Sequence, residues 1–490
     1  MSRKLLGTLL ALATLAGAPA AHAAQPGVNI AGAPSAHDLD VARDLGARTV
    51  RTFLYWNDLE PTQGSINASG WAAIAGAAAA RGMKMTFVVL GTPPWANGGQ
   101  PITVPPSDPA TMASFVERFA KTAGVKGNVA GYEIWNEQDE EQFWTQDAAG
   151  RPATYAALVN AVGPAIKRGD PAATVILGPT TGNNYGFLQR LYDAGISKSA
   201  FDAIGVHTDT ACLDRGPYSF YRDNGRLAQY TFLGYREMRA TALANGDDKP
   251  IWMTELGWTT TGDLVCGRGL WAGQKPAGVD QAEQAAFLKQ AFNCMAEDPY
   301  VQVAQWFTMR DNPSAPIAEL QHYGLLTSGG APKPAFAAFQ QIAGAPGHDI
   351  LDEACGDFAG PTVRIHAPTA GQRFAGALTI RASAIDPSGV GRITFRVDDR
   401  PEEIRNFTTG LADGAPVELQ WQGAKTLPDG PHKITVEAVD PQGNIGRSVV
   451  EVVKAPAGSI ASTIRTQVKL GRKLRCKGRT CTLTGRAGVL

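Results

Sequence analysis

The stretch AGYEIWNE, residues 130–137, joins the pattern of a buried strand to a glutamate, and the acidic run QDEE (138–141) follows at once. A charged turn at the protein surface would explain these acidic residues without giving them a function. The alternative is that Glu137 lies at the carboxyl end of a strand, at the mouth of a barrel, where it could handle protons. The rest of the chain decides between these two interpretations.

Seven further apolar, β-branched runs accompany this stretch within residues 25–345, and Ala-rich helical patterns separate them. Asp108 and Asp280 are typical helix starts, and Gly82 and Gly124 are typical helix stops. Eight strand–helix units in about 320 residues predict an α/β fold, a (β/α)8 TIM barrel. A doubly wound open sheet would need a Gly-rich phosphate turn after an early strand, and the sequence has none. The eight runs are GVNIAG (27–32), TVRTFLYW (49–56), KMTFVVLG (84–91), AGYEIWNE (130–137), TVILGPT (174–180), FDAIGVH (201–207), PIWMTELGW (250–258) and VQVAQWFTM (301–309).

The pattern changes after Cys355 to short alternating strands with turn signals between them. This texture predicts an all-β sandwich over residues 361–455, joined to the barrel (24–345) by a linker (346–360). The passage LPDGPHKITVEAVDPQGN (427–444) resembles the Ig-like modules of secreted bacterial enzymes. Residues 456–490 contain no acidic residue and are interpreted as a basic tail, either a solvated appendage or an incomplete β-module.

The first 23 residues have the three parts of a secretory signal peptide. A basic start (Ser2 to Lys4) precedes an apolar run (Leu5 to Ala16), and Ala21-His-Ala23 is a small-x-small cleavage site. We therefore expect a secreted or cell-envelope protein with no membrane span. Forty-five basic residues balance forty-five acidic ones, so nothing points to a nucleic acid as partner.

Six cysteines in an exported chain favour disulfides. Their proximity in the predicted barrel favours the pairs Cys212–Cys266, Cys294–Cys355 and Cys476–Cys481, among the 15 pairings that six cysteines allow. No pair has C-x-x-C spacing and no His tract accompanies them, so we expect no metal site. We expect no cofactor and a monomer.

Two glutamates fall at the carboxyl ends of predicted barrel strands, where barrel enzymes carry their catalytic residues. Glu137 follows the fourth run, and Glu255 lies within the seventh. A solvent-facing acid is the alternative for Glu137. It is weaker for Glu255, because the surrounding residues mark a buried strand, where an ionised carboxylate is costly unless it is paired or used. Opposed carboxylates at a barrel mouth suit the cleavage of glycosidic bonds.

The motifs WNEQ (135–138) and TELGW (254–258) resemble the paired signatures of the retaining glycoside hydrolase clan built on this barrel, which includes cellulases, xylanases, mannanases and β-xylosidases. Further passages lean toward its family 39-like or family 5-like branches, in the correct order along the barrel. They are TVRTFLYWNDLEP (49–61), VVLGTPPWA (88–96), QWFTMRDNP (305–313) and HYGLLTSGGAPKPAFAAF (322–339).

The resemblance implies roles for four residues. Glu137 would be the acid/base and Glu255 the nucleophile, while Asn136 would hydrogen-bond the sugar 2-hydroxyl. Arg51 would lie beside Glu255 and keep it ionised, because a nearby opposite charge favours the charged form. The alternative for Arg51 is a buried ion pair with Glu133.

Four more residues are candidates for substrate binding. Trp306 would be the platform under the sugar, with a core tryptophan as the alternative. His207 ends the sixth run and is interpreted as a hydrogen-bonding group of the site and not as a metal ligand. Trp95 and Trp144 are subsite candidates, for which packing is an equal alternative.

One departure from the clan's pattern concerns the sixth strand, where His-x-Tyr is common. Here the sequence has His207-Thr-Asp209, so either Asp209 alters the contact to the nucleophile or Tyr218 or Tyr221 replaces the tyrosine. This departure leaves the substrate open.

The sequence thus predicts a secreted retaining hydrolase of β-linked carbohydrate. An inactive carbohydrate-binding or cell-wall protein and a transglycosylase with the same site are the alternatives, and contact with the cell wall through the C-terminal module stays open.

Overall fold

In the computed structural model, the residues described are 24–209, 216–261, 264–266, 273, 276–344, 354–412, 414–456, 474–477 and 480–483. The chain divides into two compact units, Met1–Asp357 and Phe358–Leu490. The predicted signal peptide and most of the basic tail lie outside the described residues.

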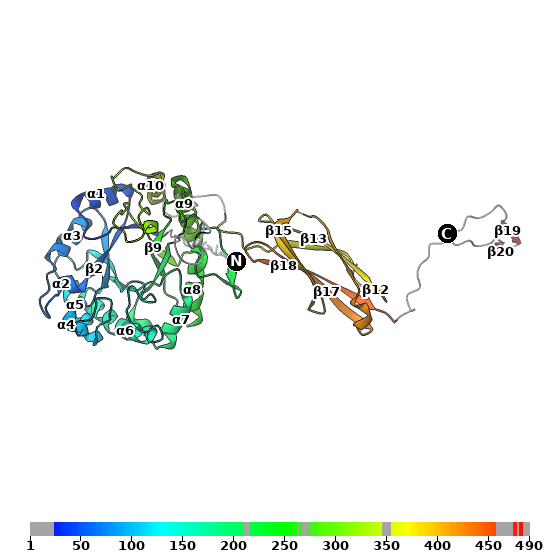
Figure 1. Cartoon of the computed structure of the whole chain (residues 1–490), viewed down its shortest axis with the longest axis horizontal. Helices are drawn as coiled ribbons and strands as arrows, with labels where there is room; N and C mark the ends of the chain where they lie inside the picture. The colour runs from blue at the N-terminus through cyan, green and yellow to red at the C-terminus, as the bar shows by residue number, and fades with distance from the viewer. Residues whose placement is uncertain are drawn as a thin grey trace, which may run out of the picture. The chain divides into compact units, whose positions relative to one another are not determined.

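The first unit is a closed barrel of parallel strands surrounded by helices, which confirms the predicted fold (Figure 1). Within the described residues the strands follow one another around the barrel in the order β1-β10-β9-β6-β5-β4-β3-β2. Their bounds are β1 Gln25–Asn29, β2 Thr49–Tyr55, β3 Lys84–Leu90, β4 Val129–Ile134, β5 Thr174–Leu177, β6 Ala203–Asp209, β9 Ile251–Gly257 and β10 Val301–Trp306.

Helices follow the strands, and the predicted helix signals are confirmed at their ends. The Asp108 carboxylate caps α5 by accepting from the Ala110 N–H, and Asp280 forms a capping box with Glu283 at the start of α9. Gly82 and Gly124 adopt positive φ angles a few residues beyond α3 and α5. The helices are α1 Ala36–Leu45, α2 Trp56–Leu59, α3 Ser69–Ala79, α4 Pro94–Asn97, α5 Pro109–Ala120, α6 Arg151–Gly169, α7 Tyr185–Asp193, α8 Tyr235–Ala244, α9 Gln281–Glu297 and α10 Pro334–Gly344.

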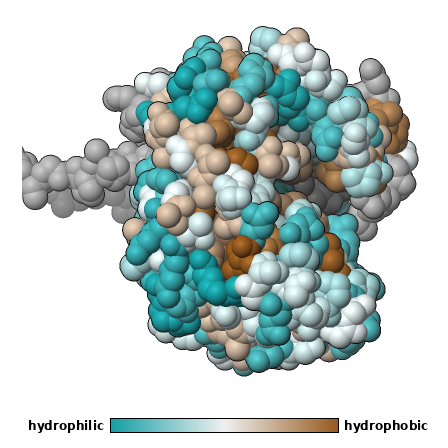
Figure 2. All heavy atoms as spheres, turned by 90° about the vertical axis from the view of Figure 1, so that its left-hand side faces the viewer, coloured by the Kyte–Doolittle hydropathy of each residue, from teal (hydrophilic) through white to brown (hydrophobic). Residues whose placement is uncertain are grey.

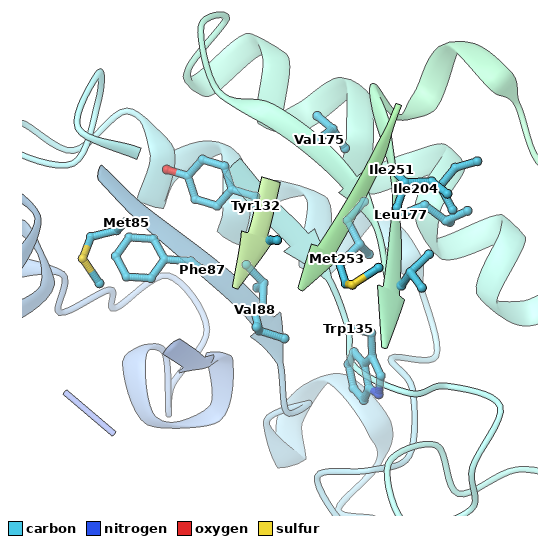
Figure 3. Packing of buried hydrophobic residues seen from close by; sticks show 14 of the residues in the cluster. Met85, Phe87, Val88, Tyr132, Trp135, Val175, Leu177, Ile204, Ile251 and Met253 are labelled. Carbon is cyan, nitrogen blue, oxygen red and sulfur yellow. The ribbon is translucent and has the colours of Figure 1, made fainter. Parts of the chain in front are cut away.

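The interior of the barrel is filled by side chains in layers. The layer at the amino ends of the strands is apolar and contains Trp252 and Val303. Above it, Gln305 donates through Nε2 to the hydroxyls of Thr49 and Thr86. The next layer toward the carboxyl ends begins with Arg51. Figure 3 shows part of the packing around these strands, with Trp135 beyond the arrowheads.

Strand β9 contains a bulge that interrupts its alternation. Met253 pairs with Val206 of β6, but the next pair is His207 with Glu255, so Thr254 is skipped. A register shift occurs at the same place on the β10 side. Trp252 and Glu255 therefore both face the barrel interior although three positions separate them.

One face of the barrel unit carries residues of mixed hydropathy. Figure 2 shows hydrophilic residues interspersed with residues of intermediate hydropathy on the face that carries α1 and α3, and the most hydrophobic residues in small separate patches. No helix in the described part of the chain combines the length and the apolar character that a membrane crossing requires.

The second unit contains two packed sheets, which confirms the predicted sandwich. The orders are β11-β13-β16 and β12-β18-β17-β14-β15, and pairing is antiparallel except between β12 and β18. Phe395, Val436 and Trp421 are buried between the sheets. The strands are β11 Thr362–Ala367, β12 Gln372–Phe374, β13 Leu378–Ile385, β14 Val390–Val397, β15 Arg400–Leu411, β16 Val417–Trp421, β17 Gly430–Val439 and β18 Ile445–Lys454.

The cysteine predictions have three outcomes. The Cys294–Cys355 disulfide is confirmed and fastens the segment after α10 to α9. Cys266 is disulfide-bonded, but its predicted partner Cys212 lies outside the described residues. Strands β19 (Leu474–Lys477) and β20 (Thr480–Leu483) place Cys476 opposite Cys481 in register, and a bond between their side chains stays a prediction.

Candidate active site

Arg51 is the centre of the polar layer at the carboxyl ends of the strands. Its side chain is 1% exposed, and its Nη1 donates to Glu255 Oε1 at 2.5 Å while its Nη2 donates to Glu133 Oε1 at 2.5 Å. Arg51 therefore makes both of the ion pairs that the sequence had offered as alternatives. Burial lowers the pKa of Arg51, but the charges of Glu133 and Glu255 outweigh it, so the pKa of the guanidinium is raised and the group stays charged.

Glu255 enters this layer because of the bulge in β9. Its side chain is 8% exposed and accepts from Arg51, and its carboxylate lies 3.6 Å from His207 Nε2. Asn29, at the end of β1, accepts from Arg51 Nη1 through Oδ1 at 2.7 Å. Its Nδ2 donates to the carbonyl of Thr254, the residue before Glu255. Asn29 thus connects the arginine to the bulge.

Glu137 lies just past the end of β4 in an unusual backbone. Trp135 has φ +69° and Glu137 has φ +41°, which is the left-handed region that non-glycine residues rarely adopt. The Glu137 side chain is 12% exposed, and its Oε1 lies within hydrogen-bonding distance of His207 Nδ1, at 2.9 Å. The alternative of a solvent-facing turn therefore does not hold for Glu137, whose carboxylate points toward His207.

His207 stands between the two glutamates. Its fully buried ring offers Nδ1 to Glu137, and its Nε2 lies 3.4 Å from Arg51 Nη2. One carboxylate oxygen of Glu137, one of Glu255 and a ring nitrogen of His207 all lie within 4.8 Å of one another. These three groups could also surround a cation, but the guanidinium of Arg51 in contact with Glu255 opposes a second positive charge there.

Asn136 joins the same network. It is 2% exposed, and its Oδ1 accepts from Arg51 Nη2 at 2.9 Å. This contact fixes the orientation of the amide, so Nδ2 is the end of the group left to donate to a ligand. The structure thus brings together Arg51, Asn136, Glu137, His207 and Glu255.

Of the three tryptophans predicted to bind substrate, two are buried in the core and one is half-buried. Trp306 is completely buried, donates to the Tyr323 carbonyl and packs 6.0 Å from the Trp258 ring, which favours the core alternative. Trp144 is also completely buried, between Trp135 and Tyr155. Trp95 is half-buried; its Nε1 donates to the Glu60 carbonyl. Trp95 alone of the three keeps part of its ring accessible.

Two partly exposed phenylalanines were missed by the sequence analysis. The Arg51 guanidinium lies 5.5 Å from the ring centre of Phe53, two residues further along β2. Phe307 directly follows Trp306 at the end of β10, and its ring contacts Tyr323 edge-on at 5.3 Å. Strand alternation was the available signal, because Phe53 shares the parity of Arg51, and Phe307 that of the interior Gln305.

The two candidates to replace the tyrosine that the sequence lacks on β6 differ in their surroundings. The hydroxyl of Tyr218 accepts from Asn293 Nδ2, a residue of helix α9, and Tyr221 is 41% exposed. The side chain of Asp209 lies outside what the structure describes.

Asp139 belongs to the acidic run after Glu137 but is not a surface charge. Its carboxylate accepts from the Thr181 N–H and from Asn184 Nδ2. Burial raises the pKa of Asp139 to about 6, and these hydrogen bonds oppose the rise. Glu140 and Glu141, by contrast, are exposed.

A closed (β/α)8 barrel with acidic side chains at the carboxyl ends of β4 and β9 is the architecture on which many enzymes are built. The neighbours of this chain among solved structures are glycoside hydrolases of families 39 and 5. In the second unit, residues 361–436 match the family model of a bacterial Ig domain.

Three of these structures illustrate the likeness. A family 39 glycoside hydrolase of Bacteroides cellulosilyticus WH2 has a TM-score of 0.53 at 19% identity, over 82% of this chain and 81% of its own. A GH5_18 protein of Streptomyces cattleya, solved in complex with GlcNAc, has a TM-score of 0.48 at 17% identity, over 72% and 85% of the two chains. The endo-β-1,4-mannanase of Thermotoga petrophila has a TM-score of 0.44 at 14% identity, over 89% and 98%.

At such identities the first likeness is one of fold, and the other two are too distant to support an inference. A comparison with the curated proteins gives no match.

Proposed function

We propose that this chain is a retaining glycoside hydrolase that cleaves β-glycosidic bonds by double displacement. One observation carries the proposal: carboxylate oxygens of Glu137 and Glu255 lie within 4.8 Å of each other at the barrel mouth. Retaining enzymes hold their two carboxyl groups about 5–5.5 Å apart, whereas inverting enzymes separate them by about 6.5–9.5 Å to admit a water. The short separation supports the retaining class.

Glu255 is the proposed nucleophile. It must attack the anomeric carbon as a carboxylate, and the contact with the charged Arg51 favours that ionised form. Arg51 is itself fixed by Glu133 and Asn29, so the position of Glu255 Oε1 is determined from three strands. The attack forms a covalent glycosyl-enzyme and releases the leaving group.

Glu137 is the proposed acid/base. It is the more exposed of the two glutamates. Its carboxylate contacts the ring of His207, whereas the carboxylate of Glu255 contacts the guanidinium of Arg51. In the first step it gives its proton to the glycosidic oxygen that departs. In the second step it takes a proton from the water that attacks the glycosyl-enzyme.

The neighbouring groups are suited to hold a sugar between these carboxylates. Asn136 would donate from Nδ2 to the 2-hydroxyl, an interaction that strengthens in the oxocarbenium-like transition state. Phe53 and Phe307 offer partly exposed rings beside the site for contact with an apolar sugar face. Trp95 is a candidate for a more distant subsite.

We further propose that the enzyme is exported through residues 1–23 and acts as a monomer on polysaccharide or oligosaccharide outside the cell. The barrel over residues 24–345 would carry the site, and the sandwich over 361–455 would be a spacer or a wall-proximal module. The disulfide in the first unit supports an oxidising compartment.

The roles of the two glutamates are tested by chemical rescue with azide. In Glu137→Ala, a dinitrophenyl β-glycoside needs little protonation, so the glycosyl-enzyme forms and then accumulates. Azide should release it as the β-glycosyl azide. In Glu255→Ala, azide takes the place of the nucleophile and should give the α-glycosyl azide.

The two variants must therefore yield opposite anomers, which NMR of the products distinguishes. The wild type, first screened against a panel of β-linked polysaccharides, should release a product of retained configuration. The same anomer from both variants, or an inverted product from the wild type, would contradict the proposal.

A further inference from the structure

We propose that the loop after β5, residues 178–184, and the carboxylate of Asp139 position Glu137 and His207 as one unit for proton transfer. This inference rests on the proposed role of Glu137 as acid/base. The loop itself would not contact the substrate, and it would affect the reaction only by positioning these two side chains. We call residues 178–184 the β5 loop.

The backbone that presents Glu137 requires support. Left-handed conformations at Trp135 and Glu137 cost free energy and persist only where surrounding contacts enforce them. Trp135 is held by its own bonds, since its N–H donates to the Val89 carbonyl and its Nε1 to the Phe143 carbonyl. Glu137 needs an equivalent anchor on the other side.

The β5 loop supplies that anchor through successive residues. The Glu137 N–H donates to the Pro179 carbonyl at 3.1 Å, and Gln138 Nε2 donates to the Gly178 carbonyl at 3.0 Å. A side chain at position 178 could not be accommodated, because a Cβ there would lie 2.2 Å from the Ile134 carbonyl oxygen. The close approach of the two segments therefore depends on a glycine.

Asp139 completes the attachment with its side chain. Its Oδ1 accepts from the Thr181 N–H at 3.1 Å, and its Oδ2 accepts from Asn184 Nδ2 at 2.8 Å. Asn184 is the N-cap of α7, where its Oδ1 accepts from the Phe187 N–H. The segment after β4 is thus fastened to the start of a helix.

The other end of the β5 loop holds His207. Asn183 donates from its N–H to the His207 carbonyl at 3.2 Å, and its buried Nδ2 donates to the carbonyls of Gln229 and Thr231. The His207 ring in turn meets Glu137 Oε1 at 2.9 Å. The contacts form a closed circuit from the Glu137 backbone through the β5 loop to His207 and back to the Glu137 carboxylate.

This circuit fixes the direction of the Glu137 carboxylate relative to Glu255. A displacement of about 1 Å in a catalytic group can reduce a rate on the order of 100-fold. Asp139 is therefore a positioning residue. The defect that follows from its loss should concern protonation, not the attack by Glu255.

The kinetic test compares leaving groups. Asp139→Asn keeps the shape of the side chain but replaces the oxygen that accepts from Asn184 Nδ2 by an NH2 group. Two donors then face each other, and this hydrogen bond is lost. Asn184→Ser removes the same contact from the other partner and retains an N-cap residue for α7. The control is Glu141→Gln, an exposed acid of the same run. Probes are the 2,4-dinitrophenyl and phenyl β-glycosides of cellobiose, xylobiose and mannobiose.

For both test variants, kcat/KM on the phenyl glycoside, which needs protonation, should fall by roughly 30- to 100-fold. The dinitrophenyl glycoside needs little protonation and should be affected about threefold or less. Glu141→Gln should behave as the wild type on both. Equal losses on the two leaving groups, or none, would overturn the positioning role.

A second measurement does not require activity. Hydrogen exchange followed by mass spectrometry on the full chain should show faster exchange in peptides covering residues 135–141 and 178–184 for Asp139→Asn and Asn184→Ser, and not for Glu141→Gln. Unchanged exchange would overturn the circuit. If the wild type hydrolysed none of the six probes, that result would count against the proposed function, and the exchange data would still decide on the circuit.

Discussion

Arg51 is the residue on which the site depends most, because one guanidinium satisfies groups from three other strands. It contacts Asn29 of β1, Glu133 of β4 and Glu255 of β9 from its own place on β2. A buried ion pair adds little stability compared with apolar residues of the same size, but removing one partner leaves an uncompensated charge. The cost of losing Arg51 therefore comes from the two glutamates that remain.

We expect Arg51→Met to lower the free energy of unfolding by about 3–5 kcal/mol and to abolish hydrolysis. Chemical denaturation measures the first effect. The matched control is Arg81→Met, which breaks the more exposed Arg81–Asp40 pair and should leave the stability nearly unchanged. A similar small effect in both variants would contradict the central role of Arg51.

Asp139 gives the barrel a pH dependence whose sign follows from its pKa. Burial raises this pKa from 3.8 to about 6, and Glu140 adds to the rise, while Tyr230 lies near the same carboxylate. The group therefore contributes stability that is fully present below pH 3.8 and is lost as the pH rises through about 6. The whole effect is at most about 3 kcal/mol, since one pKa unit corresponds to about 1.4 kcal/mol.

In Asp139→Asn this contribution is absent. The stability of the variant relative to the wild type should consequently be greater at pH 7.5 than at pH 5, as measured by thermal unfolding at both values. Glu141→Gln should show no such change between the two pH values. A variant whose relative stability is lower at pH 7.5 would show the sign to be wrong.

The sequence could locate the two glutamates because strand ends in a barrel share one face, whatever the details of packing. It could not choose between the alternatives for Trp306, since burial on the outer side of β10 depends on Trp258 and Tyr323, which are distant in sequence. Asn29 was missed for a similar reason. Its function lies in two contacts to other strands, and a lone asparagine carries no local signal for them.

At the scale of elements, all eight strand runs were predicted, but several extend past the observed ends. The run 130–137 stops as a strand at Ile134, because the left-handed residues Trp135 and Glu137 break the extended backbone. The pattern of apolar residues in a sequence does not reveal where the backbone leaves the extended conformation. The same holds for β9, where the alternation of hydrophobic residues cannot show a bulge within a strand that is buried throughout.

The Cys294–Cys355 disulfide stabilises the end of the barrel unit, because it joins α9 to a segment 61 residues later. Glu297 also accepts from the Cys355 N–H, so this segment has a second attachment to the same helix. Closing a loop of this length is worth about 4 kcal/mol through the unfolded state. Cys294→Ala/Cys355→Ala should therefore lower the Tm of the barrel by several degrees in calorimetry, and an unchanged Tm would contradict this.

At the scale of the whole molecule, the two units have separate cores. The barrel core and the sandwich core contain no residue in common. The change of texture in the sequence predicted this division, because helical periodicity ends where alternation begins.

A chain that ends after Asp357 should fold and keep the activity of the full protein, because it retains the barrel, the site and both cysteines of the disulfide. The kcat/KM on a soluble substrate and the Tm of the barrel transition should match those of the full chain. Loss of activity on the soluble substrate by a folded truncated chain would show that the sandwich contributes to the site.

The bulge in β9 has a consequence for how this site tolerates changes in chain length. Because it supplies one extra residue between Trp252 and Glu255, it acts as a phase correction: it reverses the face on which every later residue of the strand emerges. Deleting Thr254 would remove the bulge and restore regular pleating, and Glu255 would still face the barrel interior because it would then lie two positions after Trp252. A single-codon deletion at the bulge could thus be absorbed by the strand without moving Glu255 to the outer face, and the loop beyond Gly257 could change length freely in the same respect.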